Sequence, residues 1–338
     1  ISRLKVLTGL IFTVALGSAL FGALWELLDS SGPNFLAFYV RPHQGYAQFI
    51  NRNHFAVMAE MAVGLLIGLL LRGEFSEKIR FLGWVATGFL IYSLVAASSR
   101  GGLVSLAGMA VFAVFLHVFT KRSEPTEEGR RRRSLFGRFG VPPVLRKLIA
   151  ATVIGVLVTG FVVLTIAFVG GDQLVSRFEK VETEVAVQET TLTNRNIIWA
   201  STLDLIAERP FLGAGFGAYK TAITKFDRTN GNATLAQAHN DYLEILANGG
   251  IVGAILFAAF AGLVLYRFAG NLGRAVDRER AAYTFGALVG IFGVMVHNLV
   301  DFGLHVMVNA LVFIALIVIG AARIGTKRTA SYIEPGIA

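Results

Sequence analysis

Cysteine is absent from this sequence, and charged side chains are scarce. Without Cys the chain can form neither a disulfide framework nor a thiolate metal site. Lys, Arg, Asp and Glu together make up 16% of the 338 residues, against roughly 25% in soluble domains. Hydrophobic residues reach 54%. These proportions exclude an ordinary soluble enzyme, a disordered chain and a secreted disulfide-bonded scaffold.

The apolar residues are gathered in runs of about 20, the length of helix that crosses a hydrocarbon core of ~30 Å. We therefore predict an all-α, polytopic integral membrane bundle. Eight runs are candidate spans, at residues 4–24, 55–71, 79–97, 103–119, 148–169, 251–268, 281–299 and 304–322. The chain begins with Ile1 rather than Met, so we also expect an N-terminal part to be missing.

The basic residues indicate the direction of the spans. With the N-terminus in the cytoplasm, 21 of the 31 Lys and Arg residues fall in cytoplasmic segments and ten fall on the opposite side. This is the positive-inside bias of membrane proteins. The net charge of +9 is therefore a topology signal rather than a nucleic-acid-binding surface, and we expect membrane lipids but no nucleic acid as partners.

The 78-residue segment 170–247 is the longest break between spans. Structureless loops of this length are uncommon and usually functional. Asn194 could cap a helix that ends at Pro210. The apolar side of this helix would carry Ile198, Trp199, Leu203 and Ile206. We predict an outer loop with amphipathic helices at 170–247, between a bundle of five spans at 1–169 and a bundle of three spans with a cytoplasmic tail at 248–338.

Two of the arginines on the predicted outer side are candidate anion-binding residues. Arg100 follows Ser99 in a turn that Gly101 and Gly102 already explain. It either snorkels to lipid phosphate or binds an anionic substrate where two helices end. Arg195 begins the loop helix, and a helix N-terminus favours anions. It either binds phosphate in a bidentate manner or pairs with an acidic residue of the loop.

His239 lies just before the sixth span, in a polar stretch with Asn240, Asp241 and Glu244. Histidine titrates near neutral pH, so His239 is a candidate general base if Asp241 or Glu244 orients its ring. The alternative is a histidine without a catalytic role.

His297, Asp301 and His305 recur at intervals of four residues near the last two spans. On one continuous helix they would share a face and could bind zinc. Gly303 and the break between the spans argue against a continuous helix. We therefore favour hydrogen-bonded helix ends, and we expect neither a metal nor another cofactor.

Glu60 lies within the second span. It either faces the bundle interior and pairs with an Arg, or it snorkels outward. Arg52 and His54 begin the same span, where His54 could be a cap or an interfacial contact. The glycine-rich segment 213–217 follows no strand, so we interpret it as a turn rather than as a nucleotide-binding loop.

Arg100, Arg195 and His239 all fall on the outer side of the predicted membrane. Two guanidinium groups suit a diphosphate, and a nearby imidazole suits deprotonation of an incoming hydroxyl. A diphosphate leaving group needs charge neutralisation more than acid catalysis, and Arg supplies that without a metal. These residues predict a transferase that acts on a polyprenyl-diphosphate-linked sugar, whose lipid tail lies among the spans.

The segment from His239 resembles a family pattern. His239 and Asn240 are followed by nine residues and then by Gly250 and Gly253, as in O-antigen ligases and the related O-antigen polymerases. The segments 52–56, 99–102 and 209–215 resemble the same superfamily. The resemblance covers most of the chain from about residue 45 to 320, and its motifs are specific for the superfamily rather than for one member.

The resemblance implies a GT-C-like membrane glycosyltransferase of the bacterial inner membrane, with the long loop in the periplasm. Such enzymes move a glycan from undecaprenyl diphosphate to an acceptor, by a reaction thought to be metal-independent and inverting. His239 matches the essential loop histidine of the family, and Arg100 and Arg195 match its arginines. Family members commonly have about twelve spans, so the eight predicted here leave the lipid groove incomplete.

We therefore expect an O-antigen ligase-type transferase, with a lipid A core sugar as the first candidate acceptor. His239 is the predicted base, Arg100 and Arg195 hold the diphosphate, and the other candidate residues support them. These supporting candidates are Asn240, Asp241, Glu244, Arg52, His54, His297 and Asp301. A polysaccharide polymerase and a protein O-oligosaccharyltransferase are alternatives within the enzyme class, and a transporter is the alternative outside it.

Overall fold

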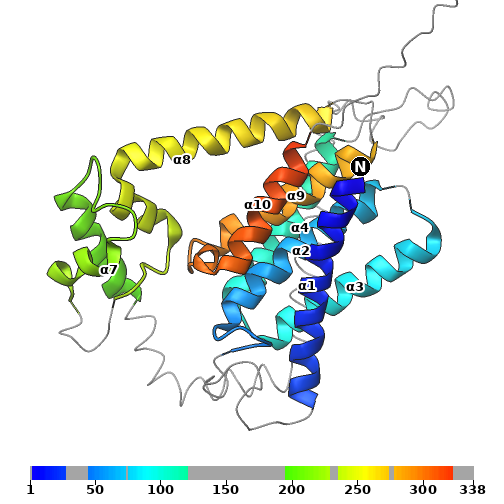
Figure 1. The fold of residues 1–338 in the computed structure, drawn as a ribbon, viewed down its shortest axis with the longest axis horizontal. Helices are drawn as coiled ribbons and strands as arrows, with labels where there is room; N and C mark the ends of the chain where they lie inside the picture. Colours follow the sequence, from blue (N-terminus) through cyan, green and yellow to red (C-terminus); the bar gives the residue numbers. More distant parts are fainter. Residues whose placement is uncertain are drawn as a thin grey trace, which may run out of the picture.

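A computed structural model describes residues 2–27, 45–73, 75–120, 195–228, 235–273 and 278–322. The regular elements of these residues are helices, apart from an isolated bridge between Tyr46 and Phe49. Within these described residues, six helices are long and apolar enough to cross a membrane. The predicted all-α membrane architecture is therefore confirmed (Figure 1).

The long helices follow the predicted spans closely. They are α1 (Ser2–Leu27), α2 (Arg52–Arg72), α3 (Glu77–Ala96), α4 (Arg100–Thr120), α8 (Asp241–Gly273), α9 (Arg278–His297) and the shorter α10 (Met307–Ala321). The predicted span 148–169 lies outside the described residues. The start predicted for the last span was wrong. Gly303–His305 forms the short 3-10 helix η4, and α10 begins only at Met307.

The centre of the bundle is the contact between α2 and α9, which is the most extensive helix pair. Glycines on both helices let the two backbones approach closely. A Cβ atom on Gly64 would lie 2.3 Å from the backbone nitrogen of Gly290, and one on Gly68 would lie 2.2 Å from that of Gly286. Small residues of this kind are typical of helix interfaces in membranes. Most of α2 is consequently buried.

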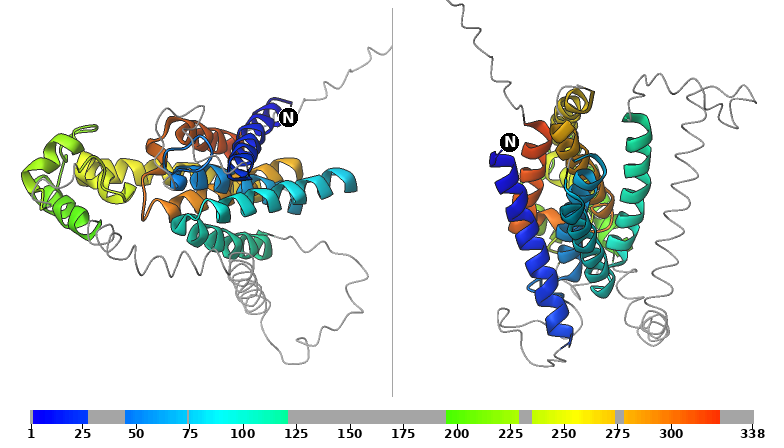
Figure 2. Two further views of the ribbon diagram at one scale, coloured as in Figure 1. Left: turned by 90° about the horizontal axis from the view of Figure 1, so that it is seen from below. Right: turned by 90° about the vertical axis from the view of Figure 1, so that its right-hand side faces the viewer.

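The described part of the long loop forms a small unit of its own (Figure 2). Residues 195–208 are helical, and α7 (Tyr219–Ala222) and the 3-10 helix η3 (Ile223–Phe226) follow. Ile198, Leu205, Tyr219 and Ile223 form a buried apolar cluster. The expected end of the loop helix before Pro210 is confirmed. The assignment of Leu203 to the apolar side was wrong, because Leu203 is 54% exposed while Leu205 is buried.

Helix α8 connects this loop unit to the opposite end of the bundle (Figure 1). It bends at Gly250, which has a φ of 59° and a ψ of −162°. A Cβ atom there would lie 2.4 Å from the backbone of Phe211, so only glycine fits. The turn at 213–217, confirmed as a turn, is tied to the bend because Gly215 donates its N–H to the carbonyl of Asn248.

Candidate functional site

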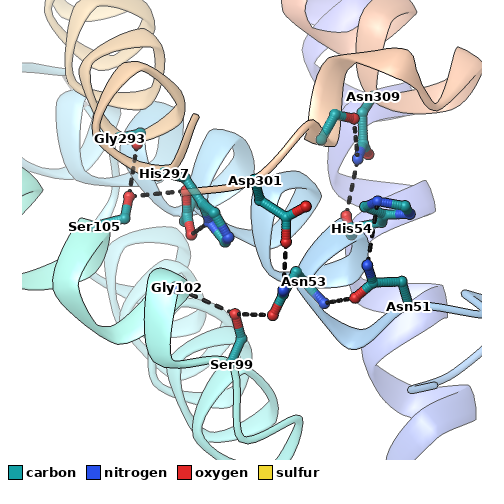
Figure 3. Close-up of polar contacts among 12 residues, drawn as sticks. Asn51, Asn53, His54, Ser99, Gly102, Ser105, Gly293, His297, Asp301 and Asn309 are labelled. Carbon is teal, nitrogen blue, oxygen red and sulfur yellow. Dashed lines mark hydrogen bonds and ion pairs between the residues drawn. The ribbon is translucent and has the colours of Figure 1, made fainter. Parts of the chain in front are cut away.

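Three helix ends are joined by hydrogen bonds at one end of the bundle (Figure 3). Asn53, in the first turn of α2, links the segment after α9 to the start of α4. Its Oδ1 accepts a hydrogen bond from Ser99 Oγ at 2.8 Å, and its Nδ2 donates to Asp301 Oδ2. Ser99 in turn accepts the N–H of Gly102 and so caps the start of α4. Asn53 thus fixes the segment after α9 against the start of α4.

The glycines after Arg100 have a steric role that the sequence alone did not show. A Cβ atom on Gly101 would lie 2.8 Å from His297 Nε2, and one on Gly102 would lie 2.9 Å from the Cβ of Ala56. Glycine at both positions therefore lets the start of α4 lie directly against α2 and the end of α9. Arg100, the first residue of α4, is exposed at this junction.

Glu60 faces the bundle interior, and its partner is a histidine rather than the expected arginine. Its Oε1 lies 2.7 Å from His297 Nδ1, and its Oε2 accepts a hydrogen bond from Ser105 Oγ at 2.8 Å. Glu60, Ser105 and His297 are fully buried. The alternative of outward snorkelling was wrong for Glu60. Pairing and hydrogen bonding offset the cost of burying the carboxylate.

Two hydrogen bonds fix Ala238, the residue directly before His239. Glu244 accepts the N–H of Ala238 at 2.9 Å, and Trp199 donates its indole N–H to the carbonyl of Ala238 at 3.0 Å. His239 itself has a φ of 51°. Non-glycine residues with positive φ are uncommon and frequently mark functional sites. The helix at 195–208 and the start of α8 together fix the backbone of Ala238, next to His239.

Asp301 is the carboxylate nearest to His239. His239 Nδ1 lies 3.7 Å from Asp301 Oδ1, which is ion-pair rather than hydrogen-bond distance. Burial alone would raise the pKa of Asp301, but His239, the N–H of Phe302 and Asn53 outweigh it and hold this pKa at about 2. The side chain therefore presents a stable negative charge to the imidazole.

The structure corrects the expectation that Asp241 or Glu244 orients His239. Both carboxylates lie beside His305 instead, whose Nε2 is 3.4 Å from Asp241 Oδ1 and 3.7 Å from Glu244 Oε1. The adjacent Asp241 carboxylate raises the pKa of His305, although burial opposes it. Asn240 caps α8 by accepting the N–H groups of Tyr242 and Leu243.

Histidine rings gather around Phe302. The ring centroids of His239, His54 and His305 lie 4.7, 5.1 and 5.8 Å from that of Phe302, all edge to face. Phe302 therefore contacts both the histidine that faces Asp301 and the histidine beside Asp241. His54 also accepts, through its carbonyl, a hydrogen bond from Asn309 of α10.

The residues His297, Asp301 and His305 do not act as one ligand set. The helix breaks after His297, as Gly303 indicated. Each side chain then turns to a different partner: His297 to Glu60, Asp301 to Asn53 and His305 to Asp241. The zinc site considered from their spacing therefore does not form from these three residues.

The two candidate arginines lie near the same helix ends. Arg195 is half-buried, and its charge acts electrostatically on His297. It lies one turn before Trp199, which bonds to the residue next to His239, so both side chains share a face of the helix. Arg100 lies next to Gly101, which packs against His297. Arg52, the remaining candidate, is the first residue of α2, next to Asn53.

The linking residues, whose side chains join helix ends that are far apart in the chain, were not predicted from the sequence. Asn53, Ser99, Ser105 and Phe302 were not singled out for their side chains, although Asn53 and Ser99 lie within the segments that resemble the superfamily. Their roles depend on contacts between residues far apart in the chain, such as Asn53 with Asp301. No local pattern predicts such contacts.

The sequence pattern of the O-antigen ligase family matches residues 85–258, just over half of the chain. The chain belongs to this family. It is therefore a multi-pass membrane protein of a glycosyltransferase family whose substrates are lipid-linked glycans. No curated protein matches the chain.

Residues 85–258 contain only some of the polar residues that meet at this end of the bundle. Arg100, Arg195 and His239 lie within residues 85–258. Asn53 and Asp301 lie outside this segment on either side, and the fold brings them to the end of the bundle where His239 and the start of α4 lie.

Proposed function

We propose that this O-antigen ligase family protein transfers a glycan from undecaprenyl diphosphate to an acceptor hydroxyl, with a lipid A core sugar as the acceptor. The transfer takes place on the periplasmic side of the bacterial inner membrane. The observation that carries the proposal is the convergence of His239, Asp301 and the start of α4 on one end of the bundle. The excess of Lys and Arg in the predicted cytoplasmic segments of the sequence supports this orientation.

His239 is the general base of the proposed reaction. Asp301 faces Nδ1 of its imidazole at 3.7 Å, which favours the tautomer with the proton on Nδ1. Nε2 then carries the lone pair that accepts the proton of the acceptor hydroxyl. The Asp301 charge also stabilises the imidazolium that forms. This is the role that the orienting carboxylate has in other acid–base pairs.

The reaction is an inverting displacement at the anomeric carbon. The acceptor oxygen forms the new bond to this carbon, and the bond from the carbon to the diphosphate oxygen breaks. The electron pair leaves with the diphosphate, and the hydroxyl proton goes to His239. Arg100 and Arg195 neutralise the charge that develops on the diphosphate. Because guanidinium groups supply this charge, the proposed reaction is metal-independent.

The test is glycan transfer by the full chain reconstituted in liposomes. The donor is undecaprenyl-diphosphate glycan, and the acceptors are a lipid A core glycolipid, a second donor molecule and an acceptor protein. His239→Ala should lower kcat by about 10²–10⁴-fold, the usual contribution of a general base. His117→Ala, near the opposite end of α4, is the matched control and should transfer normally.

Each outcome of this assay tests one part of the proposal. Transfer to a second donor molecule would identify a polymerase, and transfer to protein would identify a protein oligosaccharyltransferase. Full activity of His239→Ala would contradict the assignment of His239 as the general base. Loss of wild-type activity with a chelator, restored by a divalent cation, would contradict the metal-independent step. Uptake of a solute without any transfer would support a transporter instead.

A further inference from the structure

Exposed apolar side chains gather on the turn at residues 210–217, which lies between the helix at 195–208 and α7. Phe211, Leu212 and Phe216 are 70%, 73% and 78% exposed. The turn itself contains no charged residue. Large apolar side chains exposed together mark an interaction site, because contact with water is unfavourable for each of them. An apolar partner would therefore stabilise this turn.

The turn is attached to α8 at the bend of that helix. Four backbone hydrogen bonds of 2.8–3.1 Å join residues 210–215 to residues 247–252. Glycines allow the close contact on both sides. A Cβ atom on Gly213 would lie 2.5 Å from the backbone of Asn248, as one on Gly250 would meet the backbone of Phe211. The position of the turn is therefore set by α8.

The part of α8 that follows the bend is apolar and faces away from the protein. Its hydrophobic run begins at Ile251, directly beside the turn. Ile251, Ile255 and Leu256 are exposed, and only 11% of the most apolar stretch of this helix is buried. In a membrane protein, lipid chains surround such a surface. The turn therefore lies at the level where α8 enters the hydrocarbon.

Basic side chains flank the turn on both sides. Residues 208–225 carry three basic residues, Arg209, Lys220 and Lys225, and one acidic residue, Glu208. Glu208 is paired with Lys225 and lies 3.9 Å from Arg209. Arg209 and Lys220 are both exposed. Long basic side chains can reach lipid phosphates while the neighbouring apolar residues lie deeper, so this pattern fits a lipid monolayer.

We propose that residues 210–217 insert into the lipid monolayer beside α8, with Phe211, Leu212 and Phe216 in contact with acyl chains. The loop unit is then attached to the membrane at two points, by α8 and by the inserted turn. Because this unit helps to fix Ala238, insertion sets the height of the adjacent His239 above the bilayer. The proposal does not depend on the glycan-transfer reaction.

Because the chain has no cysteine, a single introduced cysteine carries the only spin label. The full chain with Leu212→Cys is labelled with a nitroxide and reconstituted in vesicles of phosphatidylcholine and phosphatidylglycerol. Electron paramagnetic resonance then measures collisions of the label with oxygen, which enters lipid, and with a water-soluble nickel complex. The label should collide mainly with oxygen, at a depth of about 5–10 Å, as in other interfacial apolar segments. Phe211→Cys should give the same result and serves as a second, independent variant.

Leu203→Cys is the matched control. Leu203 belongs to the same loop unit and is 54% exposed, but it is followed by Asp204, which pairs with Arg228. A label at this position should collide mainly with the nickel complex. Leu263→Cys on α8 is the lipid reference, because Leu263 is 66% exposed within the apolar span. Its label should collide mainly with oxygen.

Three results would overturn the inference. A label at Leu212 that is as accessible to nickel as the label at Leu203 would show that the turn lies in water. A label at Leu212 that is shielded from both reagents and broadened by a second label would show that another copy of the chain covers the turn. Labels at Leu212 and Leu203 that both lie in lipid would show that insertion is not confined to residues 210–217.

Discussion

At the scale of single residues, histidines that look alike in the sequence have different environments. His297 is buried against Glu60, His305 lies between Asp241 and Glu244, and His239 faces Asp301. The position of His239 next to a span made it a candidate general base. Its partner could not be predicted, because Asp301 is 62 residues further along the chain, while two nearer carboxylates turn to His305.

His305 gives a pH-dependent contribution to stability. Its pKa is raised by Asp241, with Glu244 adding to the effect. A raised pKa means that the folded state favours the protonated form. The contribution is therefore fully present below the ordinary pKa of 6.5 and is lost as the pH rises through the raised value. Asp241 and Glu244 are the charged groups that contact His305.

We expect the Tm of the wild type to exceed that of His305→Gln most clearly at about pH 6, below the ordinary histidine pKa. The difference should shrink as the pH is raised past the histidine titration. The measurement is thermal unfolding of both proteins in detergent across this range. A Tm difference that stays constant or grows toward alkaline pH would show that His305 is not stabilised as a cation.

At the scale of elements, hydropathy located the described spans well but not all of their ends. The last helix starts at Met307, because residues 303–305 form a 3-10 turn. Helix α8 starts at Asp241, earlier than the predicted span at 251, because Asn240 caps it and its first turns are polar. Apolar composition cannot reveal such a start. The bend at Gly250 likewise depends on its contact with Phe211.

The α2–α9 contact requires small residues, so Gly68→Ala should destabilise the bundle. The added Cβ would lie 2.2 Å from the backbone of Gly286, which cannot move like a flexible side chain. We expect a loss of about 1–3 kcal/mol in the free energy of unfolding, as for other overpacked interiors. Thermal unfolding in detergent measures this loss.

Gly88→Ala on α3 is the control for this prediction. No atom lies within 4 Å of a Cβ built at Gly88, and alanine is the better helix former. The Gly88 variant should be as stable as the wild type or more so. Equal stability of the Gly68 and Gly88 variants would show that the close approach of α2 and α9 is not needed.

At the scale of the whole molecule, the fold joins parts of the chain that the family segment does not contain. Residues 85–258 supply Arg100, Arg195 and His239, while α2 supplies Asn53 and the connection after α9 supplies Asp301. Arg100, Arg195 and His239 stay predicted site residues, while the superfamily itself could be predicted from local motifs. The linking residues could not, because their contacts depend on the packing of the complete bundle.

The most direct test of this account is a double-mutant cycle of glycan transfer between His239 and Asp301. If Asp301 acts through the imidazole, Asp301→Asn should lower kcat by about 10²-fold in the wild-type background, and His239→Ala by about 10²–10⁴-fold. The double variant should then be no slower than His239→Ala alone, because residues that act as a unit are not additive. A double variant whose loss equals the product of the two single losses, with all three proteins folded, would contradict the account.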